Sequence, residues 1–134
     1  MAGSGGAAGT IYWTLALTNR TSKACTLSGT PVAQPLRSRT ARIAVGPTAV
    51  AMRFAGRGSM VTIKPHATAS VILGVGETSN YPVARCAPKK AGAVSATFTR
   101  GTSRTRLYFT LPITVCTKLS STRISGIALG TKSP

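Results

Sequence analysis

The sequence predicts an all-β protein in which about seven to nine short strands form an antiparallel β-sandwich. Apolar and polar residues alternate at period two in several short segments. Glycine, proline and small polar residues separate these segments at close spacing, and no segment keeps a helical period for longer than one turn. At 134 residues, the chain has the size of one domain with one core.

The segment 10–27 predicts a strand, a turn and a second strand. The apolar face of the first strand is formed by Ile11, Trp13, Leu15 and Leu17. Trp13 is the only tryptophan of the chain, and it lies in the row that we expect to be buried. Polar residues at 19–23 favour a turn, after which Cys25 and Leu27 resume the inward phase. We therefore expect a hairpin-like unit that supplies much of the core.

Residues 28–60 show weaker patterns. Gly29 and Pro31 are expected to end the second strand and to leave an edge-like extended piece at 32–34. Three arginines follow, at positions 37, 39 and 42. Short strands are expected near 43–45 and 50–54, with a loop at 56–59.

Alternation is clear again after residue 60. Val61 and Ile63, a turn at 64–68 and a second alternating row at 69–75 predict a hairpin. Residues 76–92 have no period and predict a long connection with one helical turn around 83–86. The remaining expected elements are a strand at 94–98, a turn at 100–103, a strand at 105–113 and a terminal strand at 124–129.

We expect three parts along the chain: a flexible leader at 1–9, one sandwich domain at 10–130 and a tail at 131–134. The leader has no basic segment followed by an apolar one, so we do not interpret it as an intact signal peptide. An exported domain whose signal has been removed and a cytosolic chain both fit this composition.

Charge is the outlying feature of the composition. Seventeen lysines and arginines face a single carboxylate side chain, Glu77, which gives a formal net charge of +16. Nearly every cation must therefore be solvated, hydrogen-bonded to a carbonyl, stacked on an aromatic ring or neutralised by another molecule. High net charge also favours a monomer.

The chain has three cysteines, Cys25, Cys86 and Cys116, and none of them belongs to a Cys-x-x-Cys motif. Loop entropy does not select a disulfide. Closing the Cys86–Cys116 loop would stabilise the folded protein by roughly 3.7 kcal/mol, and closing the Cys25–Cys86 loop would contribute only about 0.6 kcal/mol more. Position favours Cys86 with Cys116, since Cys86 lies in a loop and Cys116 at a strand end, whereas Cys25 shares the buried phase with Leu27. Three reduced thiols in a cytosolic protein remain the alternative.

Several motifs resemble a secreted actinobacterial domain family known only as a domain of unknown function. They are Leu17-Thr18-Asn19, the run from Cys25 to Pro31, VTIKPHATA at 61–69, Asn80-Tyr81-Pro82, Cys86-Ala87-Pro88 and the late Cys116. His66 stands where that family more often has glycine. The resemblance implies an immunoglobulin-like sandwich, exported or lipid-anchored at the cell envelope, and it implies no reaction. Strong basicity is not part of the family pattern.

Catalytic and metal chemistry find little support in the residues. General acid–base catalysis needs a positioned proton carrier, and the chain has one histidine, His66, and one carboxylate, each in a turn or loop. A Cys25–His66 enzyme needs an exposed thiolate, but Cys25 is expected in the core. Zinc bound by the three cysteines and His66 matches no compact ligand spacing. We predict no metal, no cofactor and no catalytic residue.

The basic residues predict an anion-binding patch. Arg104 and Arg106 project from one strand face, and the turn brings Arg100 near them. Arg85, Lys89 and Lys90 join the patch if the proposed disulfide fastens their loop beside it. Stacking aromatics are sparse and no helix fits a major groove, so nucleic acid is expected to bind only non-specifically.

We therefore expect a non-enzymatic, exported cell-envelope module that binds anionic polymers or a membrane surface. A basic nucleic-acid-associated protein of the cytosol is the second hypothesis, and a cysteine-dependent enzyme is the third.

The charge imbalance leads to a first prediction, because repulsion among unpaired cations opposes the compact state. Raising the salt concentration from about 0.01 M to about 0.1 M shortens the screening length from about 30 Å to about 10 Å. We expect the melting temperature to rise over this range, measured by circular dichroism in sodium chloride. Potassium chloride is the control and should give the same rise. A melting temperature that stays constant or falls contradicts the prediction.

Overall fold

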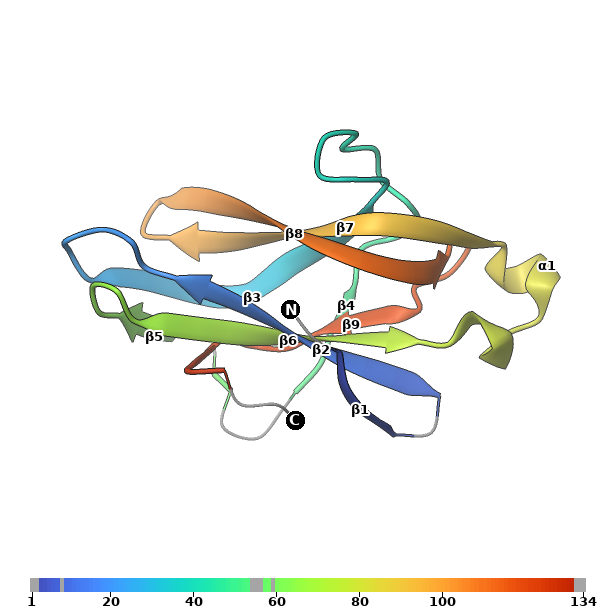
Figure 1. Cartoon of the computed structure of the whole chain (residues 1–134), viewed down its shortest axis with the longest axis horizontal. Coiled ribbons are helices and arrows are strands. Elements are labelled where there is room, and N and C mark those ends of the chain that lie inside the picture. The colour runs from blue at the N-terminus through green and yellow to red at the C-terminus, as the bar shows by residue number, and fades with distance from the viewer. Residues whose placement is uncertain (1–2, 8, 54–56, 59, 132–134) are drawn as a thin grey trace.

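The computed structural model describes residues 3–7, 9–53, 57–58 and 60–131, and these form a β-sandwich (Figure 1). The first sheet has the strand order β1 (Gly3–Ala7), β2 (Thr10–Thr18), β6 (Thr68–Gly76), β9 (Thr122–Ile124) and β4 (Val50–Ala51), with β10 (Ala128–Leu129) also paired to β6. The second sheet has the order β5 (Met60–Ile63), β3 (Cys25–Leu36), β7 (Pro88–Arg100) and β8 (Ser103–Cys116). The predicted all-β class is confirmed.

The strand pairs are antiparallel except for one. β4 pairs with β9 in parallel, and every other strand pair within the described residues is antiparallel. Two short helices, η1 (Thr78–Asn80) and α1 (Val83–Cys86), lie in the connection from β6 to β7. The helical turn predicted around 83–86 is thus confirmed.

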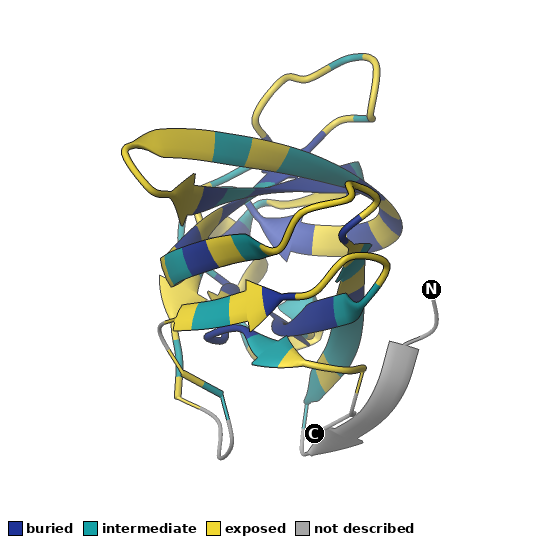
Figure 2. Ribbon diagram, turned by 90° about the vertical axis from the view of Figure 1, so that its left-hand side faces the viewer, coloured by how far each residue is buried: buried dark blue, intermediate teal, exposed yellow. Residues whose placement is uncertain are grey.

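Period-two alternation places the core between the sheets (Figure 2). In β8, Phe109, Leu111 and Ile113 are buried and alternate with exposed residues, as predicted. The central strand β6 is buried almost throughout its length. Other large members of the core are Leu15, Leu27, Ile63, Val71, Leu73, Val94, Phe98, Val115, Ile124 and Ile127.

The row predicted on the first strand is buried at only one position. Leu15 is fully buried, but Trp13 and Leu17 are half-buried and Ile11 is 43 % exposed. β2 faces the edge strand β8 across the sandwich, and in the described residues β8 pairs with β7 alone. Because β8 is the edge of its sheet, the side chains of β2 that point toward it are covered less fully than those between central strands. The predicted orientation is right, the predicted burial of Trp13 is partly right because Trp13 packs against the core, and the predicted burial of Ile11 is wrong.

Two predicted hairpins are in fact crossovers between sheets. β2 belongs to the first sheet and β3 to the second, and β5 and β6 are likewise divided. Alternation identifies the face of a strand that meets the core. Because the strands of both sheets face the same core, alternation does not show whether two successive strands belong to one sheet or to two. The β7–β8 hairpin is correctly predicted, and its turn contains Gly101 at φ +60°.

β3 is longer than the sequence predicts. Gly29 and Pro31 do not end it, because a bulge between Ser28 and Val32 absorbs them and Gly29 takes φ +79°. The piece at 32–34 is not an edge, since it pairs with β7 on one side and meets the segment 44–49 on the other.

The weakly patterned segments form less regular structure than predicted. The strand predicted near 43–45 is reduced to one bridge between Leu36 and Ala44. The strand predicted at 50–54 is confined to β4, and residue 54 lies outside the described residues. In the loop predicted at 56–59, residues 56 and 59 also lie outside them, while Gly58 bridges to Ile127.

The two ends of the chain also differ from the predictions. Within the predicted leader, Gly3–Ala7 forms β1 and pairs with β2, because backbone pairing does not require the side chains from which a strand is predicted. The predicted terminal strand is divided into β9 and β10, and Leu129 is 58 % exposed. Residues 132–134 of the predicted tail lie outside the described residues.

The two crossovers meet at Asn19, which is only 8 % exposed. Its Nδ2 donates hydrogen bonds to the carbonyls of Lys23 at 2.8 Å and Ile63 at 2.9 Å. Its Oδ1 accepts from the backbone and the hydroxyl of Thr21 at 3.0 and 2.7 Å. Its backbone joins the second crossover, because Asn19 N donates to Ala67 O and His66 N donates to Asn19 O.

The predicted Cys86–Cys116 disulfide fastens the other end of the sandwich. The two Cα atoms lie 4.5 Å apart, and both residues are buried. The bridge connects α1 to the end of β8, which lies opposite the β5–β6 crossover (Figure 1). Cys25 is a free thiol and packs, half-buried, against the core.

The hydrogen bonds of Asn19 predict that Asn19→Ala strongly lowers the stability of the folded protein. The substitution leaves the Ile63 carbonyl without its amide donor, and a buried unsatisfied group costs about 1–3 kcal/mol. We expect a loss of about 2–3 kcal/mol in the free energy of unfolding, measured by urea denaturation. Asn80→Ala is the matched control, since this exposed amide donates to Gly9 O at 3.2 Å and to no other group among the described residues. Equal losses in the two variants contradict the assigned role of Asn19.

His66 predicts a stabilising substitution. It adopts φ +63°, a left-handed conformation that costs a non-glycine residue about 1–2 kcal/mol. We expect His66→Gly to raise the free energy of unfolding by about 1 kcal/mol, because glycine adopts this conformation without a steric cost. Lys64→Gly in the same turn is the control and should destabilise. A lower urea midpoint for His66→Gly refutes the prediction.

Candidate anion-binding site

The six cations predicted to form one patch are divided between the two ends of the β7–β8 hairpin. Lys89 and Lys90 pair with Val115 and Thr114 near α1, which carries Arg85. Arg100, Arg104 and Arg106 lie toward the hairpin turn. The Lys90 and Thr97 positions on β7 are about 23 Å apart at the usual rise per residue of a strand.

The predicted union of these two groups is therefore wrong. The disulfide does hold the Arg85 loop to Cys116, as predicted. Cys116, however, is the end of β8 remote from Arg104 and Arg106. The three cations near α1 consequently lie on a different part of the surface from the three near the turn.

The loop at 37–43 supplies the cations that accompany Arg106. The Arg42 guanidinium lies over the Tyr108 ring, with its central carbon 3.7 Å from the ring centroid. Its Nε also donates to the Arg39 carbonyl at 2.9 Å. Arg106 Nε donates to Thr97 Oγ1 at 3.1 Å. Each of the two guanidinium groups thus has a defined position.

Backbone contacts hold this loop in place. Ser38 Oγ accepts a hydrogen bond from Ala41 N at 2.7 Å. The Arg37 carbonyl accepts from Gly92 N at 3.1 Å, beside the bulge of β7. A Cβ atom at position 92 would lie 2.7 Å from that carbonyl oxygen, so the close approach requires glycine.

A cleft of about 310 Å³ lies between this loop and the outer face of the second sheet. We call it the Arg42–Arg106 cleft. Its lining residues are Val32, Gln34, Leu36, Arg42, Ala44, Thr48, Ser95, Thr97, Arg106 and Tyr108. Gln34, Ser95 and Thr97 give it a polar floor, and its lining contains no carboxylate.

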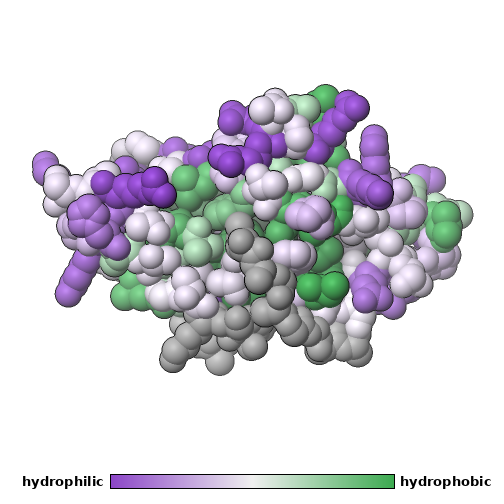
Figure 3. Space-filling view, viewed as in Figure 1, coloured by the Kyte–Doolittle hydropathy of each residue, from purple (hydrophilic) through white to green (hydrophobic). Residues whose placement is uncertain are grey.

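A second hollow adjoins the cleft along β8. It has a volume of about 430 Å³, and Arg39, Arg106 and Tyr108 are among its lining residues. Arg106 and Tyr108 therefore belong to both hollows. Figure 3 shows strongly hydrophilic residues on the side of the molecule that carries the 37–43 loop and the β7–β8 hairpin, above a band of apolar residues.

Arg39 and Arg42 are the site residues absent from the sequence prediction. Their signal is the run of three arginines at positions 37, 39 and 42. That run does not show which strand the loop folds against, because the contact with Tyr108 joins residues far apart in the chain.

Other cations have structural partners, in the ways that the composition led us to expect. Arg57 donates to the backbone carbonyl and the hydroxyl of Ser70, and burial lowers the pKa of its guanidinium. Arginine nevertheless remains protonated in proteins. Lys118 Nζ donates to the Ala84 carbonyl at 3.3 Å.

Of the residues considered for catalysis, His66 and Glu77 lie far from each other. His66 is exposed in the β5–β6 crossover, whereas Glu77 is exposed beyond the far end of β6, about 30 Å away along the strand. Cys25 pairs with Ile63 and is half-buried. Across the described ranges, no group of three His, Cys, Asp or Glu side chains is arranged to hold a metal ion.

The fold and the cleft define a class of protein, a basic β-sandwich domain with arginines gathered on one sheet face. The sequence model of DUF4232, a domain of unknown function, matches residues 1–125, so the chain belongs to that family. The predicted membership of an unknown-function family is confirmed. No curated protein and no solved structure matches the chain. Among the described residues, no helix has the length and apolarity needed to span a membrane.

Proposed function

We propose that the protein is a non-enzymatic, exported module of the cell envelope that binds an anionic polymer in the Arg42–Arg106 cleft. The observation that carries this proposal is the placement of two guanidinium groups around a polar-floored cavity without a carboxylate in its lining. Guanidinium groups pair with phosphate, sulfate and carboxylate oxygens through two parallel hydrogen bonds.

Preorganisation supports binding at this cleft. Immobilising a flexible side chain on association costs about 0.5–1.5 kcal/mol. Tyr108 already holds Arg42 and Thr97 already holds Arg106, so much of this cost is met in the free protein. The net charge of +16 also raises the local concentration of polyanions and speeds their encounter with the protein.

The disulfide and the sparse catalytic chemistry support the remaining parts of the proposal. A buried disulfide is typical of proteins in oxidising compartments, whereas the cytosolic alternative requires reduced thiols. His66 and Glu77 lie far apart, so they do not form an acid–base pair. A polymer fits better than a monovalent anion, because two adjoining hollows share Arg106.

The proposal predicts that Arg42→Gln/Arg106→Gln weakens polyanion binding more than an equal loss of charge elsewhere. Lys89→Gln/Lys90→Gln is the matched control, since it removes the same charge near α1. With labelled polygalacturonate or long-chain polyphosphate near physiological salt, we expect the arginine variant to lose about 10- to 100-fold in affinity. The lysine variant should lose only a few-fold, measured by fluorescence anisotropy.

Two outcomes contradict this proposal. Equal losses in the two variants indicate attraction by net charge without a defined site, and an affinity indifferent to salt excludes an electrostatic site. Single-stranded DNA and phosphatidylglycerol vesicles are the comparison ligands. Tighter binding to either one than to both polyanions, lost in the arginine variant, assigns the cleft to nucleic acid or to a membrane instead.

A further inference from the structure

A separate cavity of about 340 Å³ lies between the first sheet and the far end of β8. Trp13, Ile11 and Ile113 form apolar parts of its wall, and Glu77, Ser79 and Thr114 form polar parts. It therefore contains the only tryptophan and the only carboxylate side chain of the chain. We call it the Trp13 cavity.

The fold itself explains why this cavity is open. Ile11 and Trp13 point toward the interior from β2, but in the described residues β8 is the last strand of its sheet, so no further strand covers them on that side. Ile11 consequently keeps 43 % of its surface exposed, and Trp13 is half-buried. Apolar surface of this kind next to polar groups is typical of small-molecule sites.

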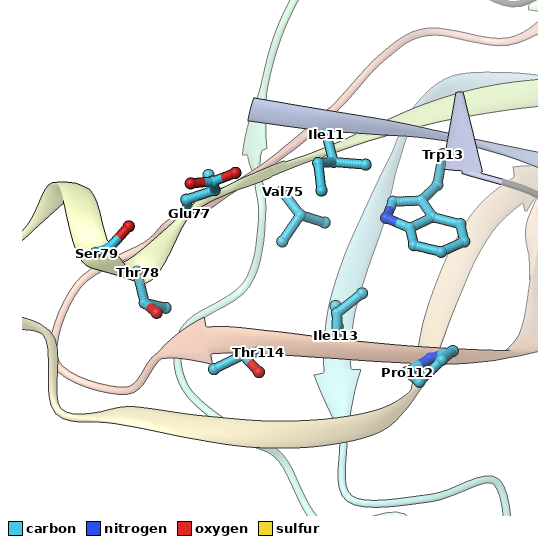
Figure 4. A pocket seen from close by; sticks show the side chains of 10 residues that line it. Ile11, Trp13, Val75, Glu77, Thr78, Ser79, Pro112, Ile113 and Thr114 are labelled. Atoms are coloured by element: carbon cyan, nitrogen blue, oxygen red, sulfur yellow. The ribbon is translucent and has the colours of Figure 1, made fainter. Parts of the chain in front are cut away.

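The apolar and polar groups occupy different ends of the cavity. Figure 4 shows Trp13 at one end, Ile11 and Ile113 in the middle, and Glu77 and Ser79 at the other end. Within the described part of the chain, the side chains of Glu77, Ser79 and Thr114 make no hydrogen bond or ion pair with the protein. The Glu77 and Ser79 side chains are therefore free to bind a ligand, whereas the Thr114 side chain points from β8 away from Ile11 and Trp13 (Figure 4).

The charges narrow the class of ligand. The Glu77 carboxylate disfavours an anion in this cavity, while the net charge of +16 disfavours a cation anywhere on the protein. A wholly apolar ligand would desolvate Glu77 and Ser79 without replacing their hydrogen bonds to water. A neutral ligand with one apolar face and several hydroxyl groups satisfies all three conditions.

We propose that the Trp13 cavity binds a neutral sugar unit. The C–H face of the ring stacks on the Trp13 indole, and the hydroxyl groups of the sugar donate to the Glu77 carboxylate. Ser79 exchanges further hydrogen bonds with the sugar. The volume of about 340 Å³ suits one or two sugar rings. This inference does not rest on the anion-binding proposal, because the two sites use different stretches of β8.

Trp13 provides the measurement, because all indole fluorescence of the protein arises from it. The intact protein is titrated with the neutral methyl glycosides of glucose, galactose, mannose, arabinose and N-acetylglucosamine. Glucuronate and glucosamine serve as anionic and cationic counterparts of the same ring. We expect a saturable fluorescence change with at least one neutral glycoside, and weaker binding of both charged sugars.

Two substitutions with calorimetric readout locate the bound sugar. Glu77→Gln should weaken binding by about tenfold, because it replaces charged hydrogen bonds with neutral ones. Ser79→Ala should weaken it a few-fold, whereas Thr110→Val, an exposed position of β8 outside the cavity lining, should not. Arg42→Gln/Arg106→Gln should leave sugar binding unchanged. Sugar binding in the Trp13 cavity and anion binding in the Arg42–Arg106 cleft can therefore be tested independently of each other.

The inference is overturned if none of the neutral glycosides saturates the fluorescence change. It is also overturned if Glu77→Gln binds sugar as tightly as the unaltered protein, or if the charged sugars bind as tightly as the neutral ones. Trp13→Phe, which keeps an aromatic ring of smaller area, should bind sugar more weakly by calorimetry while retaining the native circular dichroism spectrum.

Discussion

The buried amide of Asn19 is the interaction on which the sandwich topology depends. The chain passes from one sheet to the other after β2 and again after β5, and neither passage is held by the hydrogen bonds of a hairpin. Asn19 joins these two crossovers through its side chain and its backbone. A buried polar side chain favours the chain arrangement in which its hydrogen bonds are made. Other arrangements of the crossovers would leave it in a low-dielectric interior without partners.

Electrostatics form the second constraint, because a chain with one carboxylate side chain cannot pair its cations internally. The structure places several of them against other groups: Arg42 on the Tyr108 ring, Arg106 on a threonine hydroxyl and Arg57 on Ser70. These contacts leave the positive charge uncompensated while fixing the geometry of the guanidinium groups. Ordered, uncompensated cations on one sheet face are the physical basis of the anion-binding proposal for this member of DUF4232.

β8 connects the two proposed sites. It is an edge strand in the described residues, and its Pro112 has no backbone N–H to offer another strand. Arg106 and Tyr108 line the cleft near one end of β8, and Ile113 and Thr114 line the Trp13 cavity near the other. A polymer of neutral sugars bearing anionic groups has the chemistry for both sites, whereas each site alone recognises only part of it.

The sequence by itself determined the all-β class, the inward phase of each clear strand, the helical turn at 83–86 and the Cys86–Cys116 bridge. These features depend on local alternation or on the position of a residue at a strand end. Only the tertiary structure decided that β2 and β3 lie in different sheets, that Trp13 borders a cavity, and that Arg42 meets Tyr108 while Lys89 and Lys90 lie elsewhere. Alternation records which face of a strand is apolar, but the partner of a strand and the course of a loop depend on contacts between residues distant in the chain.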